Sequence, residues 1–389
     1  MNRFATAMMA FCIFGAPAGA DVVTDWNTEA CAIVFEAKLG TPISNRVMAI
    51  VQTAVYEAAK SATNASPEAA VAAANRAALT ALLPAHKEAI DRAYQKALAS
   101  IPDGIAKNAG IAAGEKAAAR VVARRANDGA ATAESYRPKT TAGAYVPTTT
   151  PAVPQWPQRK PWMLTSPSQF RPGPPPALGS ERWARDYNEV KSLGAKNGST
   201  RTAEQTDVAL FWEATFPSLY YGIVRSVADQ SGRDVARNAR LYAAVAQGID
   251  DAIIAVFDAK YQYGFWRPIT AIRNGDNDGN DATERDPSWS PLIETPMHPE
   301  YPCAHCILAA TVGTLLQAEI GSGPTPTLTT TSDAVNGAAR SWKTIEDFIQ
   351  EVNVARIYDG VHYRSSTETG AAMGRQVGAL AARKHFGPP

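Results

Sequence analysis

The chain has 389 residues, enough for one large domain or two ordinary ones with a sizeable core. Lys and Arg number 38 against 37 Asp and Glu, so no overall positive charge favours nucleic acid or an anionic membrane surface. Any anion site must therefore be a local cluster of cations.

The first twenty residues have the pattern of an export signal. Arg3 precedes an apolar run from Ala7 to Gly15, and Ala18-Gly19-Ala20 supplies the small residues that a signal peptidase needs. The run is shorter than the roughly 20 apolar residues of a spanning helix, and no later segment is long enough either. We expect residues 1–20 to be a signal peptide cleaved after Ala20, and a periplasmic or secreted protein without a membrane span.

Helical periodicity dominates residues 21–129. Apolar residues recur with helical spacing from Ile43 to Lys60, from Ala70 to Ala99 with a break near Pro84, and from Ile105 to Asn127. Residues 130–179 are instead rich in Thr and Pro, and proline removes amide donors and blocks helix. This connecting segment holds Trp156, Trp162 and Phe170, so we expect it to be irregular and packed on the body of the protein.

Helical patterns resume in residues 180–389. Helices are expected over Ser180–Leu193, Ala203–Trp212, Asn238–Tyr261, Ala304–Ile320 and Ser341–Tyr358, and a last helix should end near His385. The sequence therefore predicts an all-α protein, with a helical bundle in its C-terminal half.

The first of three segments that concentrate anion-binding side chains contains Lys260 and Arg267. The two are seven residues apart, close to two helical turns, although Gly264 and Pro268 indicate an interruption. Taken alone, they are more simply two solvated cations at a helix C-terminus, where the helix dipole favours them.

The second segment runs from His298 to Cys306 and precedes an apolar helix. Pro302 suits the first turn of a helix. The N–H groups of Cys303 and Ala304 would then be among the unpaired amides that form an anion cradle, with His305 one turn inside. A single histidine at such a place is more often structural than catalytic.

In the third segment, Arg356 and His362 lie on either side of Gly360. We expect the glycine to break the helix, so that both side chains can point to one place. The alternative for Arg356 is an ion pair with Asp359 or Glu351.

Together the three segments read Lys-x6-Arg-Pro, Pro-x-x-His and Arg-x5-His. This ordered signature is similar to that of the vanadium haloperoxidases and of the type 2 phosphatidic acid phosphatase superfamily. The chain resembles the bacterial haloperoxidase-like branch over most of its mature length. Further segments that carry the resemblance are Asp21–Asn27, Ala54–Ala58, Ser166–Pro172, Tyr187–Lys191, Thr200–Thr206, Phe211–Trp212 and His298–Pro302.

The resemblance implies an enzyme that binds vanadate and uses hydrogen peroxide to oxidise halide. It implies that His362 binds the vanadium and that His305 is the acid–base residue. The oxyanion would be held by Lys260, Arg267, Cys303, Ala304 and Arg356. Phosphate has the same shape, so the alternatives are a secreted acid phosphatase that cleaves a phosphate monoester through a phosphohistidine, and a non-catalytic oxyanion-binding protein.

Cys303-Ala304 departs from the family, which normally has Ser-Gly there. A thiol is a weaker and larger donor than a hydroxyl. The pKa of the Cys303 thiol should be lowered at a helix start near three cations. We expect the thiol to be reduced, because bridging it to Cys306 would distort a helical turn.

Two further hypotheses concern the same cysteines. Cys303-Ala-His-Cys306 is similar to a thiol–disulfide redox motif, although that motif follows a β-strand and no such context is visible. A zinc site from His298, Cys303, His305 and Cys306 would have to overcome the divergence of consecutive side chains on a helix. Signal cleavage would leave these two cysteines and Cys31, an odd number that makes no disulfide framework.

Overall fold

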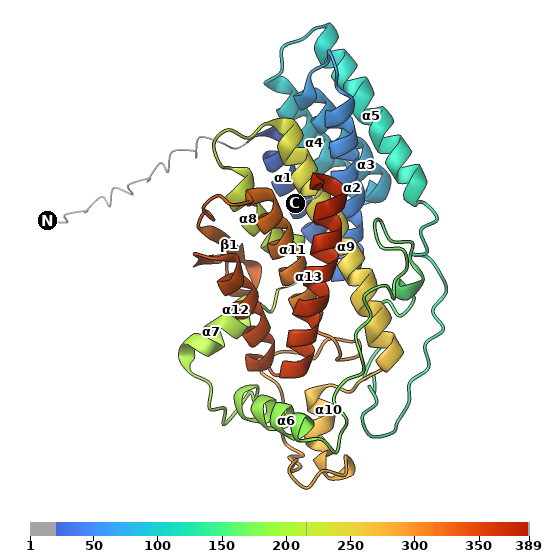
Figure 1. The fold of residues 1–389 in the computed structure, drawn as a ribbon. Coiled ribbons are helices and arrows are strands. Elements are labelled where there is room, and N and C mark those ends of the chain that lie inside the picture. The colour runs from blue at the N-terminus through green and yellow to red at the C-terminus, as the bar shows by residue number, and fades with distance from the viewer. Residues whose placement is uncertain (1–20, 215, 388–389) are drawn as a thin grey trace, which may run out of the picture.

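The structure is a computed structural model that describes residues 21–214 and 216–387, and thirteen α-helices make up most of this part of the chain (Figure 1). The predicted all-α fold is confirmed. The expected signal peptide, residues 1–20, lies outside the described residues. Among the described helices, none combines the length and the apolar character needed to cross a membrane.

Five helices form the N-terminal group at the top of Figure 1. They are α1 (Val22–Glu36), α2 (Thr41–Ser61), α3 (Pro67–Leu82), α4 (Lys87–Ala99) and α5 (Ile105–Arg125). The Asp21 carboxylate caps α1 by accepting from the amides of Val23 and Thr24 at 3.0 and 3.1 Å. Helix α2 lies at the centre of this group, because it packs on α3, α5 and the long helix α9 (Val235–Tyr263).

The Pro/Thr-rich segment lies along α9 on the right of Figure 1. Its amides find partners on that helix, since those of Trp162, Met163 and Leu164 donate to the Asp251 carboxylate at 2.7, 2.8 and 3.0 Å. Trp156 is buried as well. A buried carboxylate thus replaces the backbone hydrogen bonds that a proline-rich chain cannot make within a helix or strand.

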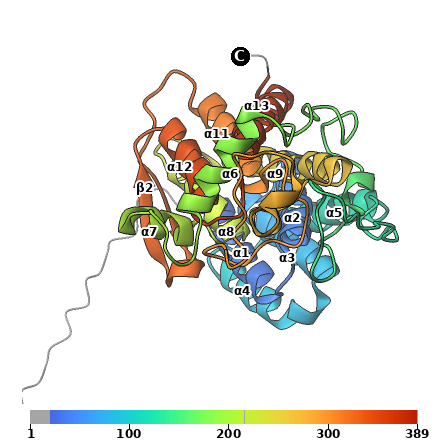
Figure 2. The ribbon, with the colours of Figure 1, turned by 90° about the horizontal axis from the view of Figure 1, so that it is seen from below.

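The C-terminal bundle brings four helix ends together. Besides α9 it contains α6 (Glu181–Leu193), α7 (Ala203–Phe211), α8 (Pro217–Ala228), α10 (Pro268–Arg273), α11 (Ala304–Ile320), α12 (Ile345–Tyr358) and α13 (Arg364–Phe386). Helix α11 packs on α13, α9 and α12, and Figure 2 shows it beside α13. The candidate site lies where α11 and α13 begin and where α9 and α12 end.

Some expected boundaries were wrong. Helices α1, α8 and α10 were not expected, and the helix expected from Ser341 begins at Ile345. Ser341 instead belongs to β2 (Ala338–Trp342), which pairs antiparallel with β1 (Leu328–Ser332). The Thr344 side chain accepts from the amide of Asp347 at 3.0 Å, and this cap fixes the start of α12.

Two apolar clusters hold the molecule together. The larger one runs without a break from residues of α1 to residues of α13, so the N-terminal helices and the bundle share one core. The smaller one lies beside the candidate site and includes Trp183, Tyr187, Trp266 and Tyr363. Because Tyr363 is adjacent to His362, this aromatic cluster fixes the backbone of the third motif.

Candidate functional site

Lys260 lies in the last turn of α9. The helix ends there because Gly264 takes the left-handed conformation, with a φ of 56°. The Lys260 side chain is fully buried, and its Nζ donates to the carbonyls of Pro299 and Glu300 at 2.9 and 2.8 Å. Burial, assisted by the charge of Arg267, holds the pKa of Lys260 well below its usual value. The cation is therefore held by dipoles rather than by an ion pair.

Arg267 precedes α10 as its N-cap residue, so it does not share a helix with Lys260. Its side chain is 1% exposed. Nε donates to the carbonyl of His298 at 2.9 Å, and one terminal nitrogen donates to the carbonyl of Val361 at 2.8 Å. The other donates to His298 Nδ1 at 3.0 Å. Burial lowers the pKa of Arg267 to about 10, although the charge of Glu300 opposes the shift.

The start of α11 differs from the expectation. Cys303 is the N-cap and the helix begins at Ala304, so Pro302 precedes the cap instead of occupying the first turn. The Cys303 amide is not a free donor, because it donates to the carbonyl of Ser366 at 3.1 Å. Placing that amide in the anion cradle was therefore wrong. Ala304, as the first helical residue, keeps an amide without a helical partner.

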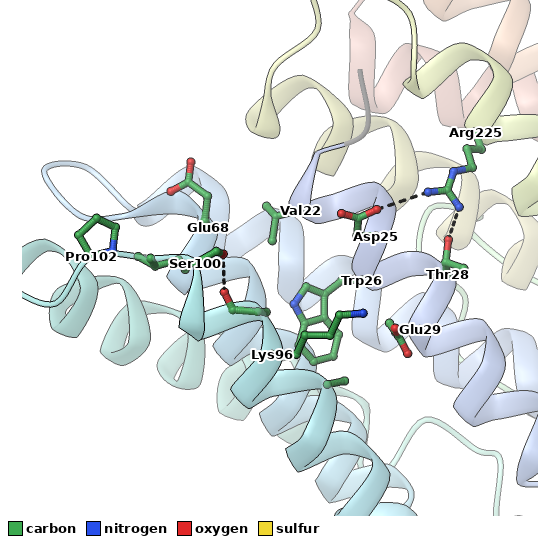
Figure 3. A pocket seen from close by; sticks show the side chains of 13 residues that line it. Val22, Asp25, Trp26, Thr28, Glu29, Glu68, Lys96, Ser100, Pro102 and Arg225 are labelled. Carbon is green, nitrogen blue, oxygen red and sulfur yellow. Dashed lines mark hydrogen bonds and ion pairs between the residues drawn. The ribbon is translucent and has the colours of Figure 1, made fainter. Parts of the chain in front are cut away.

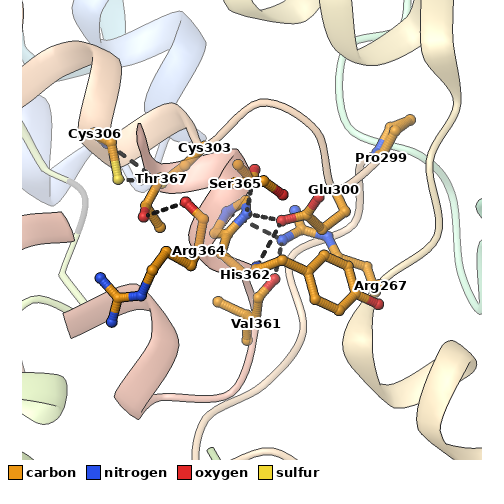
Figure 4. Close-up of polar contacts among 12 residues, drawn as sticks. Arg267, Pro299, Glu300, Cys303, Cys306, Val361, His362, Arg364, Ser365 and Thr367 are labelled. Atoms are coloured by element: carbon orange, nitrogen blue, oxygen red, sulfur yellow. Dashed lines mark hydrogen bonds and ion pairs between the residues drawn. The ribbon is translucent and has the colours of Figure 1, made fainter. Parts of the chain in front are cut away.

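The Cys303 and Cys306 thiols touch. Their sulfurs are 2.7 Å apart, and Cys303 Sγ also accepts from the Cys306 amide at 3.4 Å (Figure 4). Both cysteines are free and buried, and the reduced state stays a prediction. The argument that a bridge would distort a helical turn was wrong, because Cys303 has extended backbone with a φ of −68° and a ψ of 124°.

The pKa of the Cys303 thiol is lowered, as predicted. Burial alone would raise it, but the hydrogen bond with Cys306 and the charges of Arg356 and Lys260 together outweigh burial. The same contact, added to burial, raises the pKa of Cys306 well above its usual value. Cys303 is therefore the more acidic thiol of the pair.

His305 lies in the first turn of α11 and is 7% exposed. Its ring hydrogen-bonds the backbone of Ala214, while its Nε2 has no partner among the described residues. Burial and the charge of Arg356 hold the pKa of His305 well below its usual value. The imidazole is therefore neutral near pH 7, the form that can accept a proton.

Arg356 lies in the last turn of α12 and is 1% exposed. One of its terminal nitrogens donates to the carbonyl of Trp212 and lies 2.8 Å from an Asp359 carboxylate oxygen. The ion pair with Asp359 thus exists, whereas Glu351 binds Trp212 and Arg340 instead. Arg356 Nε has no partner in the described part of the chain, so one side of its guanidinium remains available to a ligand.

His362 lies in the short connection between α12 and α13. Gly360 ends the helical path of the backbone with a φ of 84°. Its Cα packs so closely on Gly194 that a Cβ atom at residue 360 would overlap the carbonyl oxygen of Gly194. His362 is 1% exposed, and its Nδ1 lies 2.7 Å from Glu300 Oε1 (Figure 4). Burial, with Arg267 and Lys260, holds the pKa of His362 well below its usual value.

Electrostatic coupling shows that the three motifs meet. Lys260 and Arg267 of the first segment and Arg356 of the third each lower the pKa of both His305, in the second segment, and His362, in the third. His305 and His362 also line one cavity of about 300 Å³, whose other walls are largely apolar. The sequence prediction that these five residues form one cluster therefore agrees with the geometry.

The sequence did not predict the contacts that two residues of the cluster make. Glu300 binds His362, and the ring of His298 accepts from Arg267. Both lie in the His298–Pro302 segment, but a single Glu or His between prolines has no periodicity that would indicate its partner. A buried carboxylate next to a motif histidine can be recognised only in three dimensions.

Other hypotheses find less support. The described residues contain no group of three or more His, Cys, Asp or Glu that could hold a metal ion, so zinc coordination by the cysteines has no geometric basis. Over the same residues the β-structure is one antiparallel hairpin, which is not the βαβ context of a redox motif.

A larger pocket, of about 900 Å³, lies between α1 and α4, away from the candidate site (Figure 3). Its Arg225 is paired with Asp25 and Thr28, and none of the motif residues lines it.

Comparisons with known proteins agree with this fold. The family model described as VCPO second helical-bundle domain matches residues 240–387, which contain all three motifs. The chain is similar to the first bacterial vanadium-dependent iodoperoxidase, with a TM-score of 0.79 and 21% identity over 95% of this chain and 97% of that one. It is also similar to a bacterial vanadium-dependent chloroperoxidase. The holo form gives a TM-score of 0.72 and 18% identity, over 97% of this chain and 100% of that one. No curated protein sequence matches significantly.

The chain therefore has the fold of the bacterial vanadium haloperoxidases. Its residues 240–387 are similar to the VCPO second helical-bundle domain. The resemblance seen in the sequence is confirmed.

Proposed function

We propose that the protein is a vanadium-dependent haloperoxidase-like enzyme, which binds vanadate and uses hydrogen peroxide to oxidise halide. The observation that carries the proposal is the convergence of three buried cations, Lys260, Arg267 and Arg356, on two neutral histidines. Solved bacterial structures of the same fold are described as vanadium-dependent iodoperoxidase and chloroperoxidase.

The residues present fit a tetrahedral oxyanion. Two carboxylates, Glu300 and Asp359, are buried with the three cations, so the cluster keeps an excess of positive charge that an anion would neutralise. Arg356 Nε and His305 Nε2 lack partners among the described residues and can serve a ligand. Guanidinium groups offer paired donors to oxyanions, and lysine adds a point charge.

Each residue then has a role. Lys260, Arg267, Arg356 and the Ala304 amide would hold the oxyanion, and His362 would bind vanadium through a neutral ring nitrogen. Bound vanadate supplies a Lewis-acidic centre that activates peroxide toward halide. Neutral His305 would accept the proton that peroxide releases.

Paired assays on the purified protein test the proposal. We expect halogenation of a phenol reporter only when vanadate, peroxide and halide are all present, and no hydrolysis of an aryl phosphate. Hydrolysis without vanadate would instead establish the acid phosphatase alternative. Binding of vanadate without turnover in either assay would establish a non-catalytic oxyanion-binding protein.

His362→Ala tests the vanadium ligand itself. We expect it to abolish vanadate binding in isothermal titration, because the coordinate bond to vanadium is lost. His385→Ala is the matched control, since His385 lies at the far end of α13 and hydrogen-bonds Gln247 instead. Unchanged vanadate affinity in His362→Ala would remove His362 from the ligand role.

A further inference from the structure

One carboxylate contacts the proposed ligand histidine. Glu300 Oε1 lies 2.7 Å from His362 Nδ1 and also accepts from the Tyr363 amide at 3.1 Å (Figure 4). Glu300 is fully buried and His362 is 1% exposed, so no bulk water competes for this contact. The carboxylate thus binds both the imidazole and the backbone of the residue that follows it.

The second ring nitrogen shows which way this hydrogen bond runs. His362 Nε2 lies 3.2 Å from a terminal nitrogen of Arg267. A guanidinium can only donate, so Nε2 is the acceptor and carries the lone pair. In a neutral ring the proton is then on Nδ1, and Glu300 receives it in a charge-assisted hydrogen bond.

Ser366 is the other group near Nδ1. Its Oγ is 3.4 Å from that nitrogen, much farther than the carboxylate oxygen, and it carries no charge. The role of the Glu300 side chain can also be separated from that of its backbone. The Glu300 carbonyl accepts from Lys260 Nζ at 2.8 Å, and that contact survives any side-chain substitution.

We propose that Glu300 is the positioning residue of the oxyanion site: it holds His362 with the proton on Nδ1 and the lone pair on Nε2, the nitrogen that would bind the ligand. The inference rests on the proposed function, in which Nε2 binds vanadium. Histidines that ligate metals characteristically donate their other N–H to a carboxylate or carbonyl, which fixes the ring and raises its basicity. Glu300 lies in the His298–Cys306 segment but outside Pro302-x-x-His305, so its part in the site rests on this contact.

The Nδ1 proton of His362 gives a direct test in the protein without vanadate. We expect wild type to show a downfield, slowly exchanging Nδ1–H signal in ¹⁵N–¹H NMR. Glu300→Gln should shift this signal upfield, and Glu300→Ala should lose it to exchange. The signal should be unchanged in Asp186→Asn, a matched control. Its carboxylate is also buried and accepts the Ser365 amide at 3.0 Å, but it does not touch His362.

Vanadate affinity is the second readout. We expect Glu300→Ala and Glu300→Gln to bind vanadate about 10- to 100-fold more weakly, the usual effect of losing such a partner. Glu300→Asp should recover part of the loss. If Ser366→Ala removes the Nδ1–H signal while Glu300→Gln leaves it in place, the hydroxyl orients the ring and the inference is overturned. Absence of an Nδ1-bound proton in wild type would overturn it as well. If wild type binds no vanadate, the proposed function fails, whereas the NMR result still decides the contact.

Discussion

Two buried carboxylates partly balance the positive charges of the site. Lys260, Arg267 and Arg356 are buried together with Glu300 and Asp359, three positive groups against two negative ones. Burial raises the pKa of Glu300 to about 7 and that of Asp359 to about 6, although the neighbouring cations oppose both shifts. As the pH falls through these values the carboxylates gain protons, and the site becomes more positive. An oxyanion therefore completes the charge balance of this cluster.

The substitution His305→Ala separates binding from catalysis. We expect the variant to keep its affinity for vanadate, because three cations and His362 remain. Its kcat should fall roughly 10²- to 10⁴-fold, the usual effect of a positioned acid or base. Steady-state halogenation kinetics and vanadate titration on one preparation measure both quantities. Turnover at the wild-type rate would show that another group moves the proton.

Cys303→Ser restores the hydroxyl that the family normally has. Serine is a stronger donor than a thiol and a good N-cap, whereas the Cys303 thiol is engaged with Cys306. We expect vanadate binding to strengthen by roughly 0.5–1.5 kcal/mol, the net value of an ordinary hydrogen bond, with a parallel rise in activity.

Vanadate titration and both assays on Cys303→Ser and wild type decide this prediction. Cys31→Ala is the control, because Cys31 is a buried free cysteine of α1 that belongs to none of the three motifs. If serine weakens binding or abolishes activity, Cys303 has a chemical role of its own, and the redox hypothesis gains support.

At the scale of elements, a row of glycines lets α13 approach α11. Gly370, Gly374 and Gly378 recur every four residues, so they lie on one face of α13. A Cβ at Gly374 would overlap the carbonyl of Ile307, and one at Gly370 would crowd the carbonyl of Cys303 at 2.5 Å. The close approach places the start of α13 against the start of α11, where the site residues lie.

Gly374→Ala tests this packing. Alanine gains about 1 kcal/mol of helix propensity, but overpacking against Ile307 costs about 1–3 kcal/mol. We expect a net loss of unfolding free energy in urea denaturation. Gln376→Ala, on the exposed face of α13, should change stability by less than about 0.5 kcal/mol. A Gly374→Ala protein as stable as wild type would mean that the two helices can move apart freely.

At the scale of the whole molecule, one buried ionic network ties the irregular segment to both helical groups. Arg159 donates to Asp250 of α9 at 2.5 and 2.9 Å and to Asp128, just after α5, at 2.8 Å. Both Arg159 and Asp250 are fully buried. Asp128 also binds Arg46 of α2 at 2.9 Å. The network therefore connects three helices through a segment that has little secondary structure of its own.

Arg159→Ala should destabilise the protein by about 3–5 kcal/mol, because two buried carboxylates lose a cation. Arg171→Ala is the matched comparison. Arg171 also joins this segment to α9, through Asp258 at 2.7 Å, but its side chain is 32% exposed. We expect that pair to contribute at most about 1 kcal/mol. Equal effects of the two substitutions in urea denaturation would contradict a special role for the buried network.

The sequence by itself determined the class of fold and the members of the main cluster. Apolar spacing located α2, α3, α4 and α5 within a few residues, because helical period is a local property. The order of Lys260, Arg267, His305, Arg356 and His362 pointed to one oxyanion site. Glycine at 264 and 360 indicated the breaks in the helices, since few other residues adopt a positive φ.

Only the tertiary structure decided how these residues are held. The Glu300–His362 contact joins residues 62 apart in sequence, and the Arg159–Asp250 pair joins residues 91 apart. A sequence shows that a buried polar group needs a partner but not which one, because the partner depends on how whole helices pack. The partner of the Cys303 amide was likewise decided by helix packing. The amide donates to the carbonyl of Ser366, and Ser366 lies close to the start of α11 because glycines let α13 pack closely on α11.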